Sequence, residues 1–199
     1  MKTIVFIVSL GHSGSTLIGN LVGSHKSALH LGEVVAPMEQ KKPIKCRMCV
    51  GKKCPIWDTP SVKKALNKSF NIFSYSINIK YLPWSLALPI IRLRYGGILY
   101  DEVFALHDVS HLIDSSKDIE WYRFNSKRHR YKFLFVRRPV ESYFAAVKRA
   151  KGWPVQNLIP KISLQLQKIN HFYKHLAEDK KYVVDYQKLC FNTENVMRG

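Results

Sequence analysis

The first 22 residues constrain the fold more than any other part of the chain. Residues 3–10 form a continuous apolar run rich in Ile and Val, which is typical of a strand buried on both faces of a parallel sheet. A glycine-containing turn follows at residues 11–14, and residues 15–22 show the apolar spacing of a helix. A strand, a glycine turn and a helix in this order predict an α/β fold built on a parallel sheet.

The rest of the chain continues the same alternation of strands and helices. Further strands are predicted at residues 28–31, 111–114, 132–136 and 182–186. Helices are predicted over most of residues 61–108, at 141–151 and at 162–176. We therefore expect one domain over residues 1–199, with three layers in which helices flank a central parallel sheet. An irregular insert rich in Cys and Lys interrupts it at about residues 41–60.

The charge of the chain is abnormal. Lys and Arg total 32 against 14 Asp and Glu, a net charge of +18, and most of the excess lies in residues 41–68 and 117–151. Such a balance indicates a polyanionic partner: nucleic acid, an anionic membrane surface, a sulfated or phosphorylated ligand, or an acidic glycan. No nucleic-acid-binding motif of the common modules occurs, so nucleic acid is not the expected partner.

The sequence does not predict a membrane-spanning segment. The longest apolar stretch, residues 81–91, contains two prolines and is too short to cross a bilayer. The start of the chain imitates a signal peptide, but a glycine turn stands where a cleavage site would be needed. We predict a cytoplasmic protein, and the apolar residues 82–91 leave peripheral membrane association open.

Three cysteines in the insert have the spacing of a zinc knuckle. Cys46, Cys49 and Cys54 are local, but a fourth ligand is not evident. A reduced or disulfide-linked insert is therefore favoured over a structural zinc site, and no metal is expected. Cys190 lies between Leu189 and Phe191 and is expected in the core.

The turn after the first strand has the composition of an anion-binding loop. Glycines allow the backbone to approach a ligand, and the free N–H groups and dipole at a helix start favour negative charge. A glycine turn with a serine cap is the structural alternative. The Walker lysine and its spacing are missing. The loop residues are Gly11, His12, Ser13, Gly14, Ser15 and Thr16.

Two further polar motifs follow predicted strands. Lys117, in the segment DSSKD that begins at Asp114, can reach a phosphate or sulfate, although a serine-rich helix cap with a solvated lysine is an equal alternative. Arg137, in the segment FVRRP, offers a planar fork of donors for a phosphate, or else is a surface cation. Ligands of parallel sheets bind beyond the carboxyl ends of the strands, which is where all three motifs fall.

Together and in this order, the three motifs resemble those of sulfotransferases that use 3′-phosphoadenosine 5′-phosphosulfate (PAPS), in their bacterial and carbohydrate-type branch. LGE at residues 31–33, CRMCVGKKCPIW at 46–57 and VVDYQKL at 183–189 resemble further landmarks of that family. The resemblance spans residues 3–190. It implies a P-loop-like fold, PAPS as co-substrate and no requirement for a metal.

The resemblance also implies roles for individual residues. The loop from Gly11 to Thr16 would hold the 5′-phosphosulfate, with His12 at the position where the family usually has Lys or Arg beside the leaving oxygen. Arg137 would grip the 3′-phosphate, assisted by Ser142, while Ala145 stands where the family usually has a serine. Further implied catalytic residues, besides His12, are Lys117 and the general base Glu33, with His30 as a second candidate base that is more typical of a structural histidine.

The function predicted from these features is transfer of a sulfuryl group from PAPS to a hydroxyl or amine by in-line attack. The acceptor is left open among a glycan, a lipid and a small molecule, and the basic surface favours an anionic one. A P-loop kinase or NTPase is one alternative, although no acidic magnesium ligand is evident. A non-catalytic polyanion-binding module, or a sulfotransferase that binds its nucleotide without activity, is another.

Overall fold

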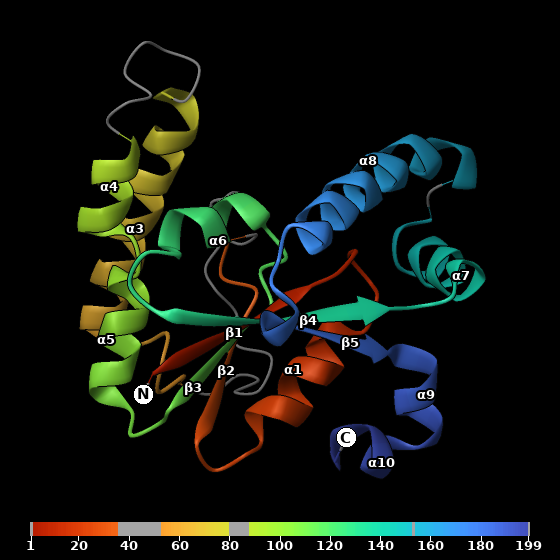
Figure 1. The fold of residues 1–199 in the computed structure, drawn as a ribbon, viewed down its shortest axis with the longest axis horizontal. Helices are drawn as coiled ribbons and strands as arrows, with labels where there is room; N and C mark the ends of the chain where they lie inside the picture. Colours follow the sequence, from red (N-terminus) through yellow and green to blue (C-terminus); the bar gives the residue numbers. More distant parts are fainter. Residues whose placement is uncertain (1, 36–52, 80–87, 153, 199) are drawn as a thin grey trace.

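The computed structural model describes residues 2–35, 53–79, 88–152 and 154–198. Its centre is a five-stranded sheet in which every pairing is parallel and the strand order is β2-β3-β1-β4-β5 (Figure 1). All five predicted strands are present, so the α/β fold is confirmed. Their bounds are β1 Thr3–Val8, β2 Ala28–Gly32, β3 His111–Asp114, β4 Arg130–Arg137 and β5 Lys181–Asp185.

Helices connect the strands and cover both faces of the sheet. The longer ones are α1 Ser15–Gly23, α3 Pro60–Ile79, α4 Leu88–Tyr95, α5 Ile98–Leu106, α7 Val140–Lys151 and α8 Val155–Lys174. The shorter ones are α6 Ile119–Asn125, α9 Tyr186–Phe191, α10 Thr193–Arg198 and the 3₁₀ helix η2 Glu178–Lys180. The helical region predicted between 61 and 108 breaks at the glycine pair before α5, as expected.

Of the short helices that the sequence did not predict, α6 and α9 each begin at an aspartate cap. Asp118 accepts hydrogen bonds from the N–H groups of the second and third residues of α6, and Asp185 does the same for α9. Such a cap satisfies N–H groups that have no partner within the helix. Because α6 and α9 have only seven and six residues, their apolar periodicity is too short to stand out.

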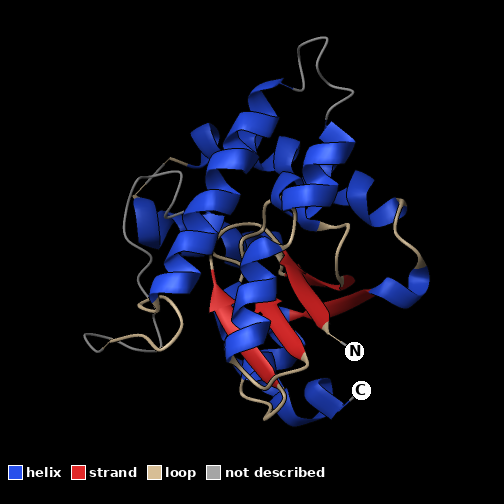
Figure 2. Cartoon of the chain, turned by 90° about the vertical axis from the view of Figure 1, so that its left-hand side faces the viewer, coloured by secondary structure: helices blue, strands red, loops and turns tan. Residues whose placement is uncertain are grey.

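The alternation of β1 separates two apolar layers. Ile4, Phe6 and Val8 belong to the larger cluster, with residues of α3, α5, α6 and α8. Ile7 faces the other way and packs with Ile18 of α1 and residues of α9 and α10. Figures 1 and 2 show the sheet lying between these two groups of helices, which gives the three-layer arrangement.

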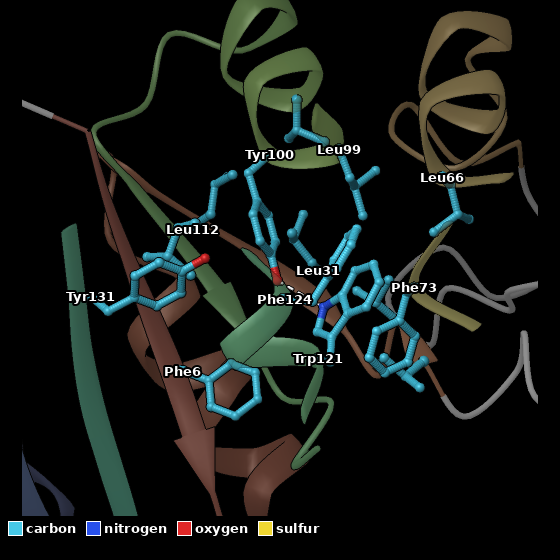
Figure 3. Packing of buried hydrophobic residues seen from close by; sticks show 14 of the residues in the cluster. Phe6, Leu31, Leu66, Phe73, Leu99, Tyr100, Leu112, Trp121, Phe124 and Tyr131 are labelled. Atoms are coloured by element: carbon cyan, nitrogen blue, oxygen red, sulfur yellow. Dashed lines mark hydrogen bonds between the residues drawn. The ribbon is translucent and has the colours of Figure 1, made fainter. Parts of the chain in front are cut away.

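Aromatic rings fill much of the larger cluster. The rings of Phe73 and Trp121 meet edge to face with centroids 5.1 Å apart, and Phe124 stacks on Trp121 at 6.0 Å (Figure 3). Trp121 and Tyr100 are fully buried there. Edge-to-face and offset contacts of this kind add stability beyond the area they bury. They fix α6 against α3, which holds the segment before α6 in place.

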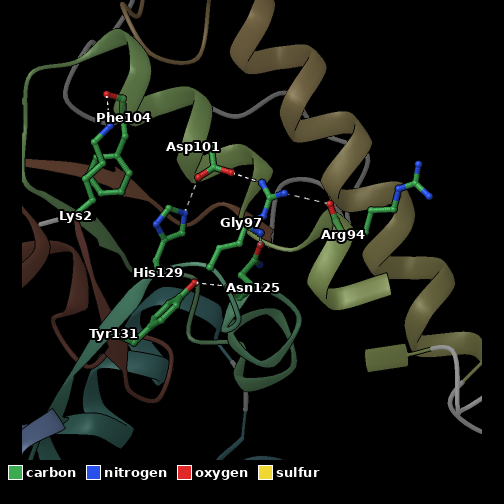
Figure 4. Close-up of polar contacts among 9 residues, drawn as sticks. Lys2, Arg94, Gly97, Asp101, Phe104, Asn125, His129 and Tyr131 are labelled. Atoms are coloured by element: carbon green, nitrogen blue, oxygen red, sulfur yellow. Dashed lines mark hydrogen bonds and ion pairs between the residues drawn. The ribbon is translucent and has the colours of Figure 1, made fainter. Parts of the chain in front are cut away.

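A polar cluster fastens α5 to the loop before β4. Asp101 forms an ion pair with Arg128, and its Oδ1 lies 3.1 Å from Nε2 of His129 (Figure 4). The N–H of Gly97 donates to Oδ1 of Asn125 at 2.8 Å. Because this loop precedes β4, the cluster lies at the amino-terminal edge of the sheet, away from the edge where the polar motifs follow the strands.

The cysteines and the membrane prediction can be followed only within the described residues. Cys54 is buried and its Sγ accepts a hydrogen bond from the N–H of Trp57, but Cys46 and Cys49 lie outside those residues, so the zinc prediction stays untested. Cys190 is exposed, so its predicted core position is wrong; the buried residue beside it is Leu189. None of the described helices is both long and apolar enough to cross a membrane.

Candidate active site

The carboxyl ends of all five strands lie at one edge of the sheet. Phe6 of β1 pairs with Asp114 of β3, which also pairs with Gly32 of β2, and Arg137 of β4 pairs with Asp185 of β5. The residues that follow each strand therefore share that edge, as the sequence predicted. Parallel sheets bind their ligands there.

The loop after β1 turns sharply into α1. His12 and Gly14 both have left-handed backbones, with φ of 61° and 95°. A non-glycine residue in this region is uncommon and indicates a conformation held by its surroundings. Gly14 caps α1 without a side-chain hydrogen bond, so the first N–H groups of the helix are left for another acceptor.

Hydroxyl groups contribute less to this loop than the sequence suggested. Oγ of Ser13 donates to the carbonyl of Leu10 at 2.5 Å, so this side chain braces the loop. Ser15 is buried, whereas Thr16 is partly exposed. A Cβ built on Gly11 would meet no atom within 4 Å, so the space beside that residue is open. In this loop the backbone, more than the hydroxyls, is therefore open to a ligand.

Arg138 and Tyr186 hold the loop from the other side. Nη1 of Arg138 donates to the carbonyl of His12 at 2.8 Å, and the guanidinium lies 4.8 Å from the centre of the Tyr186 ring. The same ring presses against Gly14, where a Cβ would come within 2.0 Å of it. Sequence reasoning missed both roles, because the contacts join segments far apart in the chain.

Arg137, the last residue of β4, is exposed and lines a cavity of about 450 Å³. It therefore stands where a ligand bound at the loop could reach it. Ser142 and Ala145 are exposed on α7 and are not part of the cavity wall. The structure thus brings Arg137 to the loop, while the contribution of Ser142 stays a prediction.

Glu33 and Lys117 meet at the ends of β2 and β3. Nζ of Lys117 donates to Oε1 of Glu33 in an ion pair whose lysine side chain is 14% exposed and whose glutamate is 36% exposed. Lys117 has a left-handed backbone, with φ of 63°. Two residues that the sequence predicted separately as catalytic are therefore held together, with the carboxylate the more accessible of the pair.

Asp114 lies fully buried beneath this pair. Its carboxylate accepts hydrogen bonds from the Tyr100 hydroxyl at 2.5 Å, from Nε1 of Trp121 at 3.2 Å and from the N–H of Ser116 at 2.7 Å. Burial raises the pKa of Asp114, because a charged carboxylate is less favourable away from water. The residue anchors the end of β3 and is not exposed to a ligand.

His30 is also committed to hydrogen bonds within the protein. Its Nδ1 lies 2.8 Å from Oδ1 of Asn20 on α1, and its Nε2 lies 3.2 Å from Oγ of Ser115. Burial, with a smaller contribution from the nearby Lys117 charge, lowers the pKa of His30 to about 4. The imidazole is neutral near pH 7, and it links α1 to the end of β3 in the way a structural histidine does.

Comparison with known proteins gives a match in fold. No family model and no curated protein sequence matches the chain. Thirteen chains of solved structures match it. One of them, described as a sulfotransferase domain from the curacin biosynthetic pathway, has a TM-score of 0.52 and 14% sequence identity over 99% of this chain and 71% of that one. The α/β fold with its five-stranded parallel sheet is therefore that of a sulfotransferase domain.

Proposed function

We propose that the protein is a PAPS-dependent sulfotransferase. The observation that carries this proposal is that an amide-rich segment and a cationic segment meet at one edge of the sheet. The loop after β1 and the arginines at the end of β4 are joined there by the hydrogen bond from Arg138 to His12. The shared fold with a sulfotransferase domain supports the same assignment.

The described residues fit a ligand that carries two separate anionic groups. The loop offers N–H groups at the start of α1 and open space beside Gly11, which suits a phosphosulfate. Arg137 is exposed near the loop and suits a second phosphate, because its guanidinium can donate two parallel hydrogen bonds. PAPS carries these two groups and supplies the sulfuryl group when bound.

Glu33 and Lys117 are the proposed groups for the acceptor. Glu33 would take the proton of the acceptor hydroxyl or amine while its oxygen or nitrogen forms the new bond to sulfur. The sulfur–oxygen bond to the 5′-phosphate breaks, and its electron pair leaves on that oxygen. Lys117 and His12 would offset the negative charge that develops, so the protein works by positioning and electrostatics. No metal takes part in this proposal.

Calorimetric titration with 3′-phosphoadenosine 5′-phosphate (PAP), against ADP at the same salt concentration, tests the proposal. We expect PAP to bind at least tenfold more tightly than ADP, and Arg137→Ala to remove most of that difference. Arg149→Ala is the matched control, because Arg149 is an exposed arginine on α7 that does not line the cavity. Equal binding of PAP and ADP would favour the kinase alternative. No binding of either would reject the co-substrate.

A further inference from the structure

A cavity opens directly beside the loop that joins β1 to α1. It has a volume of about 450 Å³ and lies between the ends of β1 and β4, with α7 and α8 over it. This volume is within the range of about 300–1,000 Å³ that is common for small-molecule sites. Ser13 of the loop and both arginines at the end of β4 line one part of it.

The remaining wall is mostly hydrocarbon. Val8 and Phe135 line the cavity from the sheet, and Ile162, Leu166 and Tyr173 line it from α8. Charged phosphates placed against such a surface would lose hydration without gaining donors. The cations and loop amides can bind the anionic ligand at one end, and the apolar end suits an uncharged group.

The cavity lies between two packing contacts of α8, one with α7 and one with the sheet. Tyr143 and Val147 of α7 form a separate buried cluster with Leu158 and Ile162 of α8. Leu10, which follows β1, packs against this cluster. The carboxyl-terminal part of α8 packs on β4, where the ring of Phe172 lies 5.1 Å from that of Phe133. In Figure 1, α7 lies beyond the tip of β4, and α8 runs back from there over one face of the sheet.

We propose that this cavity holds the apolar body, aryl or alkyl, of an uncharged acceptor whose hydroxyl leaves the cavity at the loop end, toward the ion pair of Glu33 and Lys117. The proposal rests on the proposed sulfotransferase function and names its substrate class. It departs from the anionic glycan that the net charge of the chain favoured. The basic residues at the cavity are accounted for by the co-substrate, and the apolar wall selects the acceptor.

Substitutions on one helix separate this cavity from the surface around it. Leu166→Trp would fill the cavity from α8, where Leu166 is 38% exposed. Leu164→Trp is the matched control, because Leu164 is 55% exposed on the same helix and does not line the cavity. Val140→Trp fills the cavity from α7 and serves if Leu166→Trp does not fold. Circular dichroism and thermal unfolding establish that each variant is folded.

The readouts are binding of the fluorescent probe N-phenyl-1-naphthylamine, its displacement by 1-decanol, and sulfate transfer from radiolabelled PAPS to 1-decanol and 2-naphthol. We expect Leu166→Trp to raise the Kd of the probe and the KM of both alcohols at least tenfold. The Kd of PAP should change less than twofold, and Leu164→Trp should change none of these values.

Three results would overturn the proposal. Displacement of the probe by PAP, with weaker PAP binding in Leu166→Trp, would assign the cavity to the nucleotide. Absence of probe binding to a protein that binds PAP would leave the cavity without an apolar ligand. Sulfate transfer to an acidic disaccharide, with none to either alcohol, would make the acceptor anionic. Failure of the function itself would look different, because the wild-type protein would then not bind PAP at all.

Discussion

The two halves of the strand-end edge are built differently. At the ends of β2 and β3, side chains are committed to one another: His30 to Asn20 and Ser115, Lys117 to Glu33, and Asp114 to three donors. At the ends of β1 and β4, Arg137 is exposed beside a cavity.

This difference teaches how one sheet edge can combine catalysis with binding. A catalytic group must be held within a fraction of an ångström, and hydrogen bonds inside the protein provide that rigidity. A binding surface must keep its donors available, so its partners are ligand atoms. We infer that the β2–β3 half orients the reacting groups and the β1–β4 half receives the ligands.

The largest expected effect comes from replacing the proposed general base in the β2–β3 half. Glu33→Gln keeps the shape of the side chain but removes the proton acceptor, so kcat for sulfate transfer should fall about 10²- to 10⁴-fold. The Kd of PAP should stay within twofold, because binding belongs to the other half. Steady-state kinetics and calorimetry measure the two quantities.

Glu120→Gln is the control for that experiment, since Glu120 is a partly exposed glutamate on α6 whose carboxylate pairs with Arg123 in its own helix. A Glu33→Gln enzyme with kcat within threefold of the wild type would remove Glu33 from the mechanism. Loss of PAP binding in the same variant would show that the two halves are not separate.

A smaller effect tests how Tyr186 holds the loop in the β1–β4 half. Gly14→Ala combines a left-handed φ of 95° with a Cβ that would collide with the Tyr186 ring, so unfolding free energy should fall by about 2 kcal/mol. PAP affinity should fall with it, because the loop must shift. Gly11→Ala is the matched control, with open space and an expected change of less than about 0.5 kcal/mol. Equal changes in both variants, measured by urea unfolding, would contradict the bracing role of Tyr186.

The smallest expected effect is a pH dependence in the β2–β3 half. The pKa of His30 is lowered to about 4 in the folded protein, so the unfolded chain binds the proton first as pH falls below about 6.5. Between pH 7.5 and pH 5 this histidine should remove about 1–2 kcal/mol of stability.

His30→Gln can retain hydrogen bonds to its neighbours but cannot titrate, so its unfolding free energy should vary less with pH by that amount. Burial also lowers the pKa of His129. Because His129 is present in both proteins, it contributes equally to the pH dependence of their unfolding free energies. Parallel pH profiles for the wild type and the variant would mean that His30 is not held neutral.

Sequence reasoning succeeded where the signal is local. The apolar runs of β1 and β4 and the glycine turn between β1 and α1 are contiguous, so strand order along the chain and the place of the site could be predicted. Glu33 and Lys117 could be named, but not paired, because 84 residues separate them. Tyr186 was visible only as part of a motif, since its contact with Gly14 depends on how β5 and β1 are arranged across the sheet.

The contacts of Arg138 and Tyr186 with the loop after β1 have a consequence for how the protein is made. The loop leaves the ribosome before Arg138, which follows His12 by 126 residues, and before Tyr186, which follows later still. Chain synthesis proceeds from the amino end, so the nascent loop lacks both contacts until β5 and α9 have been made. The proposed nucleotide binding should therefore wait until Tyr186 has been made, and ribosome-bound intermediates truncated before residue 186 should not retain PAP.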